Sequence, residues 1–238
     1  MKVLTVIPAR YGSTRFPGKP LTPILGKPMI LWVVEGAMKS KNFHVIVATD
    51  DKRICEVVSP FVECKMTPSD LRSGTDRVAY IAKNLDFDVV VNLQGDEPLI
   101  DGKIIDDLVE ALDESVDIVT PVRRVNRKEA EKPGAVTVVT DKYRNALYFS
   151  RSLIPFYREK KDEVFLKHIG IYVFWKNSLL KFVSLPPGKL EMIEKLEQLR
   201  ALENGMKIRV VEVSYKSIPV DYPEDVKIVE QELLKRRG

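Results

Sequence analysis

The sequence predicts an α/β fold with a mostly parallel sheet that helices cover on both faces, and with an antiparallel lobe inserted in it. Short apolar, β-branched segments alternate with segments of helical period along the first half of the chain, which is typical of successive βα units. After about residue 125, strand-like segments follow one another instead. With 238 residues, 45% of them hydrophobic, the chain can bury the core of one large domain.

The first half of the chain supplies the parallel sheet. Apolar runs predict strands at residues 3–7, 44–48, 89–93 and 118–122. Helical periodicity predicts helices near residues 28–40, 51–59, 74–84 and 101–114. Ligands bind at the carboxyl ends of the strands in such sheets, so we expect one crevice lined by the loops at residues 8–26, 49–51 and 94–98.

The second half is expected to begin with the lobe, at about residues 125–165, within a single domain of residues 1–238. Strand-like segments lie at residues 135–141, 145–150 and 168–174. Residues 189–204 predict one helix, ended by Gly205 in the left-handed conformation. Its apolar face would carry Leu190, Ile193, Leu196, Leu199 and Leu202. A strand at residues 207–213 and a helix from about Glu224 complete the chain.

Composition and charge exclude several classes of protein. The 38 basic and 34 acidic side chains are spread along the chain, which argues against nucleic acid as the main partner. Cys55 and Cys64 alone make no disulfide framework, and with two histidines we expect any catalytic metal to be held by oxygen. No apolar run is long enough for a membrane span, and residues 1–9 are too short for a signal peptide, so we expect a cytoplasmic protein. The scarcity of glutamine beside 30% charged residues suggests a thermophilic origin.

The stretch from Gly12 to Pro20 looks like a phosphate-binding loop with the wrong spacing. A P-loop has four residues between its first glycine and the Gly-Lys pair, whereas this stretch has five, and Pro20 stands where a Ser or Thr belongs. No G-x-G-x-x-G follows the first strand either. We therefore predict an extended loop whose Arg10, Arg15 and Lys19 bind a polyphosphate, helped by backbone N–H groups around Gly12 and Gly18. An ordinary surface loop is the alternative.

Two aspartates stand where a divalent cation would find oxygen ligands. Asp96 follows a predicted strand in the segment NLQGDEP, and Asp221 precedes a turn containing Pro223. Carboxylates combined with phosphate oxygens and water suit Mg²⁺. The alternative for both residues is a helix cap or a turn.

Six motifs resemble one family. IPARYGSTRFPGKPL at residues 7–21 resembles the signature of the sugar nucleotidyltransferases that make CMP-activated acid sugars, specifically the 3-deoxy-manno-octulosonate cytidylyltransferases, or CMP-KDO synthetases. The other motifs follow in order at residues 73–77, 92–98, 168–174, 196–205 and 220–226. The resemblance implies a Rossmann-like sheet of the nucleotide-diphospho-sugar transferase type.

The resemblance also implies a reaction. The family transfers CMP from CTP to the anomeric hydroxyl of 3-deoxy-manno-octulosonate (KDO) for lipopolysaccharide biosynthesis and releases pyrophosphate. The catalytic residues implied here are Arg10, Lys19, Asp96 and Asp221, with Mg²⁺ between the two aspartates. Direct proton acceptance by Asp96 is the less favoured alternative. A homodimer formed through the region around residues 125–165 is the family expectation.

Binding residues follow from the same motifs. The resemblance implies CTP binding by Ala9, Arg10, Arg15, Lys19, Arg72, Ser73, Gly74, Arg77 and Gln94. An amide such as that of Gln94 can donate to and accept from the cytosine edge, and Ser73 can also cap a helix. The resemblance implies sugar binding by Arg151, His168, Tyr172, Glu197 and Gln198. His168 and Tyr172 are expected on one face of a single strand. A structural role for His168, and an ion pair of Glu197 with Arg200, remain alternatives.

Three other functions compete with this interpretation. A sialic acid cytidylyltransferase lacks the PGKPL continuation of the first loop, and a hexose-1-phosphate nucleotidyltransferase has a glycine-rich loop where this chain has Ala9 and Arg10. A nucleotide sensor without turnover is expected to have lost Lys19 or one of the two aspartates, and this chain keeps all three. Tyr222 departs from the family pattern, where threonine is usual, and Leu93 replaces valine.

Overall fold

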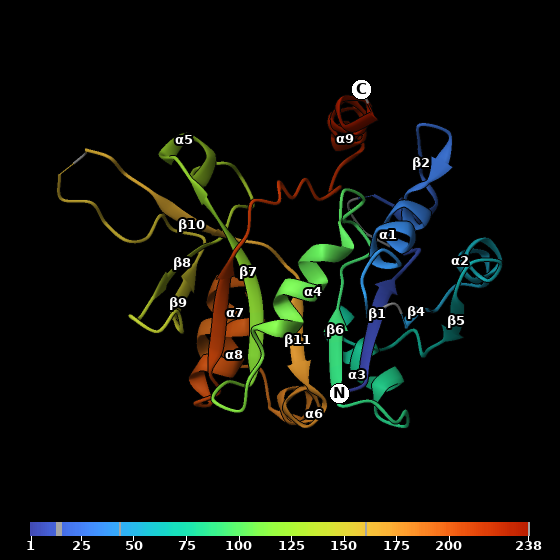
Figure 1. The fold of residues 1–238 in the computed structure, drawn as a ribbon, viewed down its shortest axis with the longest axis horizontal. Coiled ribbons are helices and arrows are strands. Elements are labelled where there is room, and N and C mark those ends of the chain that lie inside the picture. The colour runs from blue at the N-terminus through green and yellow to red at the C-terminus, as the bar shows by residue number, and fades with distance from the viewer. Residues whose placement is uncertain (13–15, 43, 160, 238) are drawn as a thin grey trace. The chain divides into compact units, whose positions relative to one another are not determined.

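The computed structural model describes residues 1–12, 16–42, 44–159 and 161–237. The chain separates into two compact units, the first formed by Met1–Asp107 with Tyr215–Gly238 and the second by Leu108–Ser214 (Figure 1). Both units combine strands with helices, so the predicted α/β class is confirmed. Among the described residues, no helix is both long and apolar enough to cross a bilayer.

The first unit contains a parallel sheet of four strands in the order β5-β4-β1-β6. These strands are β5 (Glu63–Met66), β4 (Val45–Thr49), β1 (Val3–Ala9) and β6 (Val89–Asn92). Every residue of β1 is buried, as expected of a central strand covered on both faces. The strands predicted at residues 3–7, 44–48 and 89–93 are therefore confirmed. β5 was not predicted, because it shows no apolar run. Two of its four residues are charged, and none of the four is buried, as is common in an edge strand.

Helices follow each of the strands β1, β4, β5 and β6, and one ends the chain. They are α1 (Met29–Ala37), α2 (Lys52–Val58), α3 (Gly74–Ala82), α4 (Gly102–Glu110) and α9 (Pro223–Arg237), with the boundary between the units inside α4. The first loop adds a short 3-10 helix, η1 (Lys19–Leu21), and a hairpin of β2 (Pro23–Ile24) and β3 (Lys27–Pro28). Asp51 caps the N-terminus of α2, because its carboxylate accepts a hydrogen bond from the backbone N–H of Arg53. The helices predicted near residues 28–40, 51–59, 74–84 and 101–114 are confirmed, and each is shorter than predicted.

The second unit is organised around β7 (Ile118–Val125). This strand pairs antiparallel with β10 (Phe165–His168) and β11 (Tyr172–Trp175), and parallel with β12 (Ile208–Glu212). β8 (Thr137–Thr140) lies antiparallel between β10 and β9 (Ala146–Ser150). The helices are α5 (Arg127–Ala130), α6 (Lys176–Ser184), α7 (Lys189–Glu194) and α8 (Gln198–Glu203). Antiparallel strands after residue 125 were predicted and are found.

The strand predicted over residues 168–174 is two strands. β10 ends at His168 and β11 begins at Tyr172, and the turn between them is held by the N–H of Ile169 on the carbonyl of Pro121 and the N–H of Ile171 on that of Ile169. Both strands pair with β7 one after the other, so the chain must bend between them. The expectation that His168 and Tyr172 lie on one strand was therefore wrong.

The helix predicted over residues 189–204 is also interrupted. Lys195 has a φ of 56° in the left-handed region, which separates α7 from α8. The Arg151 guanidinium donates to the carbonyl oxygens of Glu194 (2.7 Å) and Lys195 (3.2 Å), so a side chain satisfies carbonyls that a continuous helix would use internally. Ile193 is 66% exposed and does not belong to the predicted apolar face. Gly205 has the predicted left-handed φ, 71°.

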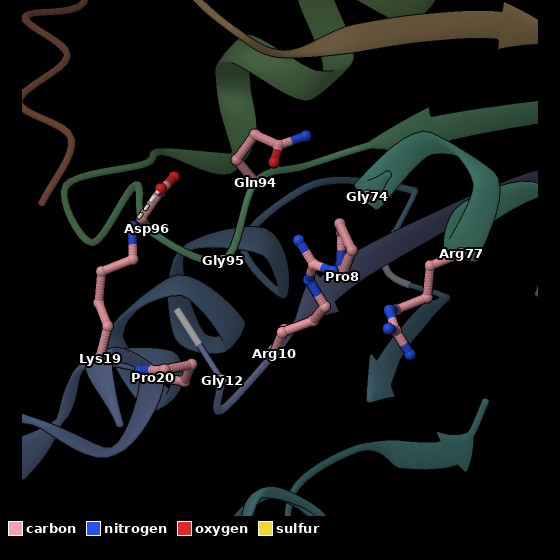
Figure 2. A pocket seen from close by; sticks show the side chains of 11 residues that line it. Pro8, Arg10, Gly12, Lys19, Pro20, Gly74, Arg77, Gln94, Gly95 and Asp96 are labelled. Atoms are coloured by element: carbon pink, nitrogen blue, oxygen red, sulfur yellow. Dashed lines mark hydrogen bonds and ion pairs between the residues drawn. The ribbon is translucent and has the colours of Figure 1, made fainter. Parts of the chain in front are cut away.

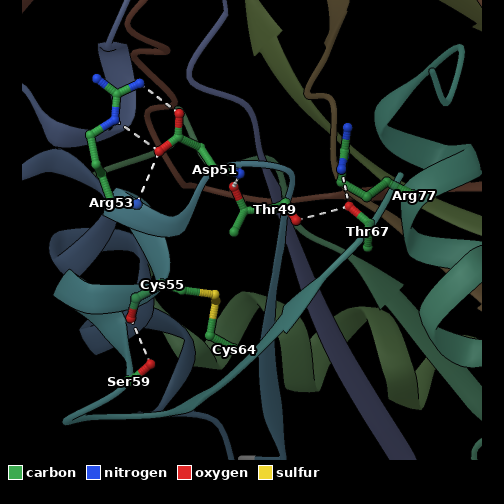
Figure 3. The surroundings of a disulfide bond; sticks show 8 residues. All are labelled: Thr49, Asp51, Arg53, Cys55, Ser59, Cys64, Thr67 and Arg77. Carbon is green, nitrogen blue, oxygen red and sulfur yellow. Dashed lines mark hydrogen bonds and ion pairs between the residues drawn. A yellow bond between two sulfur atoms is a disulfide. The ribbon is translucent and has the colours of Figure 1, made fainter. Parts of the chain in front are cut away.

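Cys55 on α2 and Cys64 on β5 form a disulfide (Figure 3). The sequence argument, which rested on the presence of only two cysteines, predicted no disulfide framework and did not anticipate this single bond. The two cysteines lie nine residues apart in sequence, and the turn between helix and strand brings their Cα atoms to 5.5 Å. The disulfide closes a short loop at the edge of the sheet.

Reduction of this disulfide is expected to lower the melting temperature of the protein. Closing a loop of this size removes conformational entropy from the unfolded chain worth roughly 2–3 kcal/mol, which corresponds to about 5–10 °C for a chain of this length. Thermal unfolding followed by circular dichroism, with and without reductant, measures the change. In the Cys55→Ser variant, reductant should have no effect. Equal melting temperatures of the oxidised and reduced wild-type protein would contradict the prediction.

Candidate active site

A pocket of about 300 Å³ opens in the first unit, at the carboxyl ends of β1 and β6 and the start of α3 (Figure 2). Its lining comes from the first loop, from α3 and from the loop after β6, and comprises Pro8, Ala9, Arg10, Gly12, Lys19, Pro20, Gly74, Arg77, Gln94, Gly95 and Asp96. The predicted loops at residues 8–26 and 94–98 thus meet in one crevice. The loop at residues 49–51 contributes through Asp50, which binds Arg77.

Two glycines allow the loops to approach closely. A side chain at Gly95 would place its Cβ 2.9 Å from the carbonyl oxygen of Pro8, so only glycine lets the loop after β6 lie against the end of β1. Gly18 has a φ of 74° and precedes η1. Its N–H donates to the carbonyl of Tyr11 (2.9 Å). The prediction that backbone donors around Gly18 bind phosphate is therefore wrong for Gly18, because the loop itself uses that donor.

Lys19 joins the two predicted metal ligands. Its Nζ lies 2.6 Å from Asp96 Oδ2 and 3.8 Å from Asp221 Oδ1, and Figure 2 shows the side chain extending to Asp96. Both carboxylates therefore reach one cation, although Asp221 precedes α9, far along the chain. Within the residues that the structure describes, no group of three or more His, Cys, Asp and Glu side chains could hold a metal ion. The site offers two carboxylates and an ammonium group.

The Gln94 amide is held by a chain of hydrogen bonds. Its Nε2 donates to Asn92 Oδ1 (2.9 Å), and the Nδ2 of Asn92 donates to Thr75 Oγ1 (2.9 Å). Because the Asn92 oxygen fixes which end of the Gln94 amide is the donor, the Gln94 oxygen is left on the side of Gly74, whose ideal Cβ would lie 3.6 Å from it. An oriented amide of this kind suits recognition of a base edge.

Arg77 is a buried cation at the pocket. Its Nη1 donates to Thr67 Oγ1 and its Nη2 to Asp50 Oδ2 (3.0 Å), whereas its Nε is buried without a partner among the described residues. Burial lowers the pKa of the guanidinium from its usual value, and the charge of Arg10 lowers it further against the opposing effect of Asp50. A bound anion would offset the unfavourable burial of this positive charge beside Arg10.

The remaining predicted CTP residues divide into three groups. Arg10 is exposed and lines the pocket together with Ala9 and Gly74. Ser73 caps α3, since its Oγ accepts from the N–H of Asp76 (3.0 Å), while Arg72 lies 3.5 Å from the Asp76 carboxylate. Neither Ser73 nor Arg72 lines the pocket. Arg15 lies outside the described residues.

Sequence reasoning missed several supporting residues. Asn92 and Thr75 orient Gln94, and Asp50 and Thr67 hold Arg77. Arg53 lies 3.4 Å above the ring of Tyr11, which fixes the first loop from the side of α2. Asn92, Thr75 and Tyr11 belong to three of the six motifs, and Asp50 to the predicted loop at residues 49–51, so these could have been found there. No sequence signal marks Thr67 or Arg53.

The predicted sugar-binding residues lie in the second unit. Thr120 Oγ1 donates to the carbonyl of Ile171 (2.7 Å) and lies 2.9 Å from His168 Nε2. A hydroxyl has one proton, so Nε2 of His168 carries the hydrogen of this pair and Nδ1 is left as an acceptor. Burial lowers the pKa of His168 to about 3, so its ring is neutral near neutral pH and offers no positive charge to a sugar carboxylate.

Tyr172 and Gln198 show features of a polar binding site. The rings of His168 and Tyr172 lie 5.4 Å apart although the residues belong to different strands. Burial, followed by the charge of Glu197, raises the pKa of Tyr172 well above its usual value, so this hydroxyl stays protonated. Gln198 is buried, and its Nε2 has no partner among the described residues. Such a donor is satisfied only when water or a ligand binds it.

Arg200 and Arg151 both have partners within the second unit. Arg200 makes a bidentate pair with Glu191 (2.5 and 2.8 Å), and the alternative of an ion pair between Glu197 and Arg200 stays a prediction. The Arg151 guanidinium holds the junction of α7 and α8, which directly precedes Glu197 and Gln198. A direct contact of Arg151 with a sugar stays a prediction, as do the sugar-binding roles of His168, Tyr172, Glu197 and Gln198.

Comparison with known proteins gives consistent results. The cytidylyltransferase family model matches residues 4–208. The 3-deoxy-manno-octulosonate cytidylyltransferase of Trichlorobacter lovleyi is 47% identical over 242 residues, 95% of this chain and 96% of the relative. That of Geobacter metallireducens is 47% identical over 248 residues, 97% and 98% of the two chains. A solved structure of CMP:2-keto-3-deoxy-manno-octonic acid synthetase complexed with CTP has a TM-score of 0.94 at 39% identity, covering 99% of this chain and 100% of that one.

Proposed function

The chain belongs to the 3-deoxy-manno-octulosonate cytidylyltransferase family, and from this premise we propose that it makes CMP-KDO and pyrophosphate from CTP and KDO for lipopolysaccharide biosynthesis. The observation that carries the proposal is the similarity to proteins of that name along nearly the whole chain. The pocket supports it, because its cations, its oriented amide and its carboxylates suit a nucleoside triphosphate.

The reaction replaces one oxygen at the α-phosphorus of CTP with another. The anomeric oxygen of the sugar forms the new P–O bond, the bond to the pyrophosphate oxygen breaks, and the hydroxyl proton passes to water. Arg10 and Lys19 would bind the triphosphate and stabilise the negative charge that collects on the leaving pyrophosphate. Gln94 and Arg77 would hold the nucleotide so that the α-phosphorus faces the attacking oxygen. No covalent intermediate with the protein is needed.

Mg²⁺ fits the carboxylates of this site. Asp96 and Asp221 both approach the ammonium group of Lys19, so two hard oxygen ligands already share a position for a cation. We propose that these two residues hold Mg²⁺ when CTP supplies further oxygens. The ion would lower the pKa of the sugar hydroxyl and neutralise phosphate charge.

A homodimer in the cytoplasm, where CTP is available, completes the proposal. Exposed apolar side chains support an interface in the region around residues 125–165, and the most exposed is Phe156 at 89%, with Tyr143, Leu147 and Val164 as the others. Light scattering of the wild-type protein and of Phe156→Asp tests this interface. A wild-type monomer would reject it.

A pyrophosphate-release assay tests the function. Purified protein is mixed with CTP, Mg²⁺ and one of KDO, its close isomers or sialic acid. We expect turnover with KDO and little with sialic acid, and the reverse order would reject the proposed substrate. Binding of CTP without pyrophosphate release from any acid sugar would instead identify a nucleotide sensor.

A further inference from the structure

The segment that carries Asp221 has no helix or strand of its own. Residues 215–222 lead into α9 as irregular chain. On one side of Asp221, the N–H of Val220 donates to the carbonyl of Asp96 (3.0 Å). On the other side, Asp225 Oδ2 accepts from the N–H groups of Asp221 (2.9 Å) and Tyr222 (2.8 Å). Irregular chain keeps one conformation only where such contacts hold it.

Glu97 ties the start of this segment to the loop after β6. Glu97 is 3% exposed, and its carboxylate accepts hydrogen bonds from Tyr215 Oη at Oε2 (2.9 Å) and from Ser217 Oγ at Oε1 (2.6 Å). Burial, followed by the charge of Glu97, raises the pKa of Tyr215 well above its usual value, so the phenol remains a donor. Buried carboxylates need such donors, because desolvation is otherwise costly.

Glu97 does not line the pocket, whereas its neighbour Asp96 does. We propose that Glu97 is a positioning residue: by binding Tyr215 and Ser217, it holds the segment that places the Asp221 carboxylate opposite Asp96 and Lys19. The inference rests on the proposed function, in which Asp221 acts in the transfer of CMP from CTP to the sugar. Glu97 touches neither substrate nor metal in this role, and its effect passes through the backbone of residues 215–221.

A purely stabilising role for Glu97 is the alternative, and the chain offers a matched control for it. Ser40 Oγ donates to the buried carboxylate of Asp106 at 2.6 Å, the same distance as Ser217 to Glu97. Ser40 and Asp106 lie in the first unit and do not line the pocket. Ser217→Ala and Ser40→Ala therefore each remove a hydrogen bond to a buried carboxylate, one on the proposed route to Asp221 and one away from it. Ser40→Ala also removes the acceptor of the Asn42 N–H (2.9 Å).

The first experiment compares kcat, CTP affinity and melting temperature in Ser40→Ala, Ser217→Ala, Tyr215→Phe and the double variant Tyr215→Phe/Ser217→Ala. We expect both single serine variants to melt at lowered temperatures, Ser40→Ala by at least as much as Ser217→Ala, because it also loses the bond from the Asn42 N–H. Ser40→Ala should keep kcat within about twofold, whereas the double variant should lose about tenfold or more, since small displacements of an acting group are costly. Calorimetry should give a CTP Kd within about twofold of wild type in all of them, because the segment supplies none of the pocket residues.

The second experiment asks whether the loss passes through Asp221. In the Asp221→Asn background, the double variant should lower the remaining rate by less than about twofold, since residues that act as one unit are not additive. An equal loss in both backgrounds, or an unchanged kcat of the double variant, would overturn the inference. If Asp221→Asn itself turned over normally, the proposed role of Asp221 would fail as well. A slow Asp221→Asn beside a normal double variant would reject only the positioning role.

Discussion

Replacing Asp96 or Asp221 with asparagine is expected to lower kcat by about 10²–10⁴-fold while CTP binding changes little. Asparagine keeps the shape of the side chain but removes the charge that a divalent cation requires. Lys19 Nζ lies within 4 Å of both carboxylates in the structure, so either substitution also removes one of its partners. Pyrophosphate release measures the rate, and calorimetry with CTP measures binding.

Asp107→Asn is the control for these variants. The Asp107 side chain is 38% exposed and pairs with Lys103, and the Asp221 side chain is 37% exposed, so the two substitutions remove similarly solvated charges. The control should turn over normally, since an exposed ion pair of this kind contributes little to stability. Near-normal turnover of both Asp96→Asn and Asp221→Asn would end the assignment of these residues to the reaction.

Lys19→Met is expected to lower kcat/KM by about 10²–10³-fold, because the ammonium group would no longer stabilise charge on the triphosphate as pyrophosphate leaves. Lys27→Met is the comparison, since Lys27 pairs with Glu35 and does not line the pocket. It should retain at least about half of the wild-type kcat/KM. Similar values for both lysine variants would show that Lys19 has no particular role.

A second measurement on Lys19→Met separates metal binding from catalysis. In the wild-type protein without nucleotide, the Lys19 ammonium competes with a divalent cation for Asp96 and Asp221. Mn²⁺ followed by electron paramagnetic resonance should therefore bind severalfold more tightly to nucleotide-free Lys19→Met than to wild type. Weaker binding by the variant would mean that Lys19 does not occupy the position of the cation.

The sequence predicted the elements whose burial is regular along the chain. β1, β4 and β6 were found because each is a buried, β-branched run, and α3 because Ser73 caps an amphipathic segment. It failed where contacts distant in sequence override the local pattern. The Arg151 guanidinium interrupts a helix 43 and 44 residues away, and pairing with β7 bends the chain between His168 and Tyr172. Edge strand β5 lacked any apolar signal.

The same division holds for the candidate site. Lys19, Asp96 and Asp221 could be named from sequence because loops after buried strands, and turns before helices, expose polar side chains at one edge of a parallel sheet. Sequence could not show that the three side chains meet, since Lys19 and Asp96 are 77 residues apart and only packing sets their distance of 2.6 Å. It also could not show that the Gly18 N–H is used by the loop.

By itself, then, the sequence determined the order and type of most elements and the residue types available for binding a triphosphate. It could do so because apolar periodicity and turn preferences depend on residues that are close together in the sequence. Only the tertiary structure decided which donors and acceptors are already used within the protein and which face the pocket. Glu97 illustrates the difference. From the sequence, this carboxylate beside Asp96 could have been a metal ligand. The fold instead buries it against Tyr215 and Ser217. A buried carboxylate needs hydrogen-bond donors, and these two hydroxyls supply them.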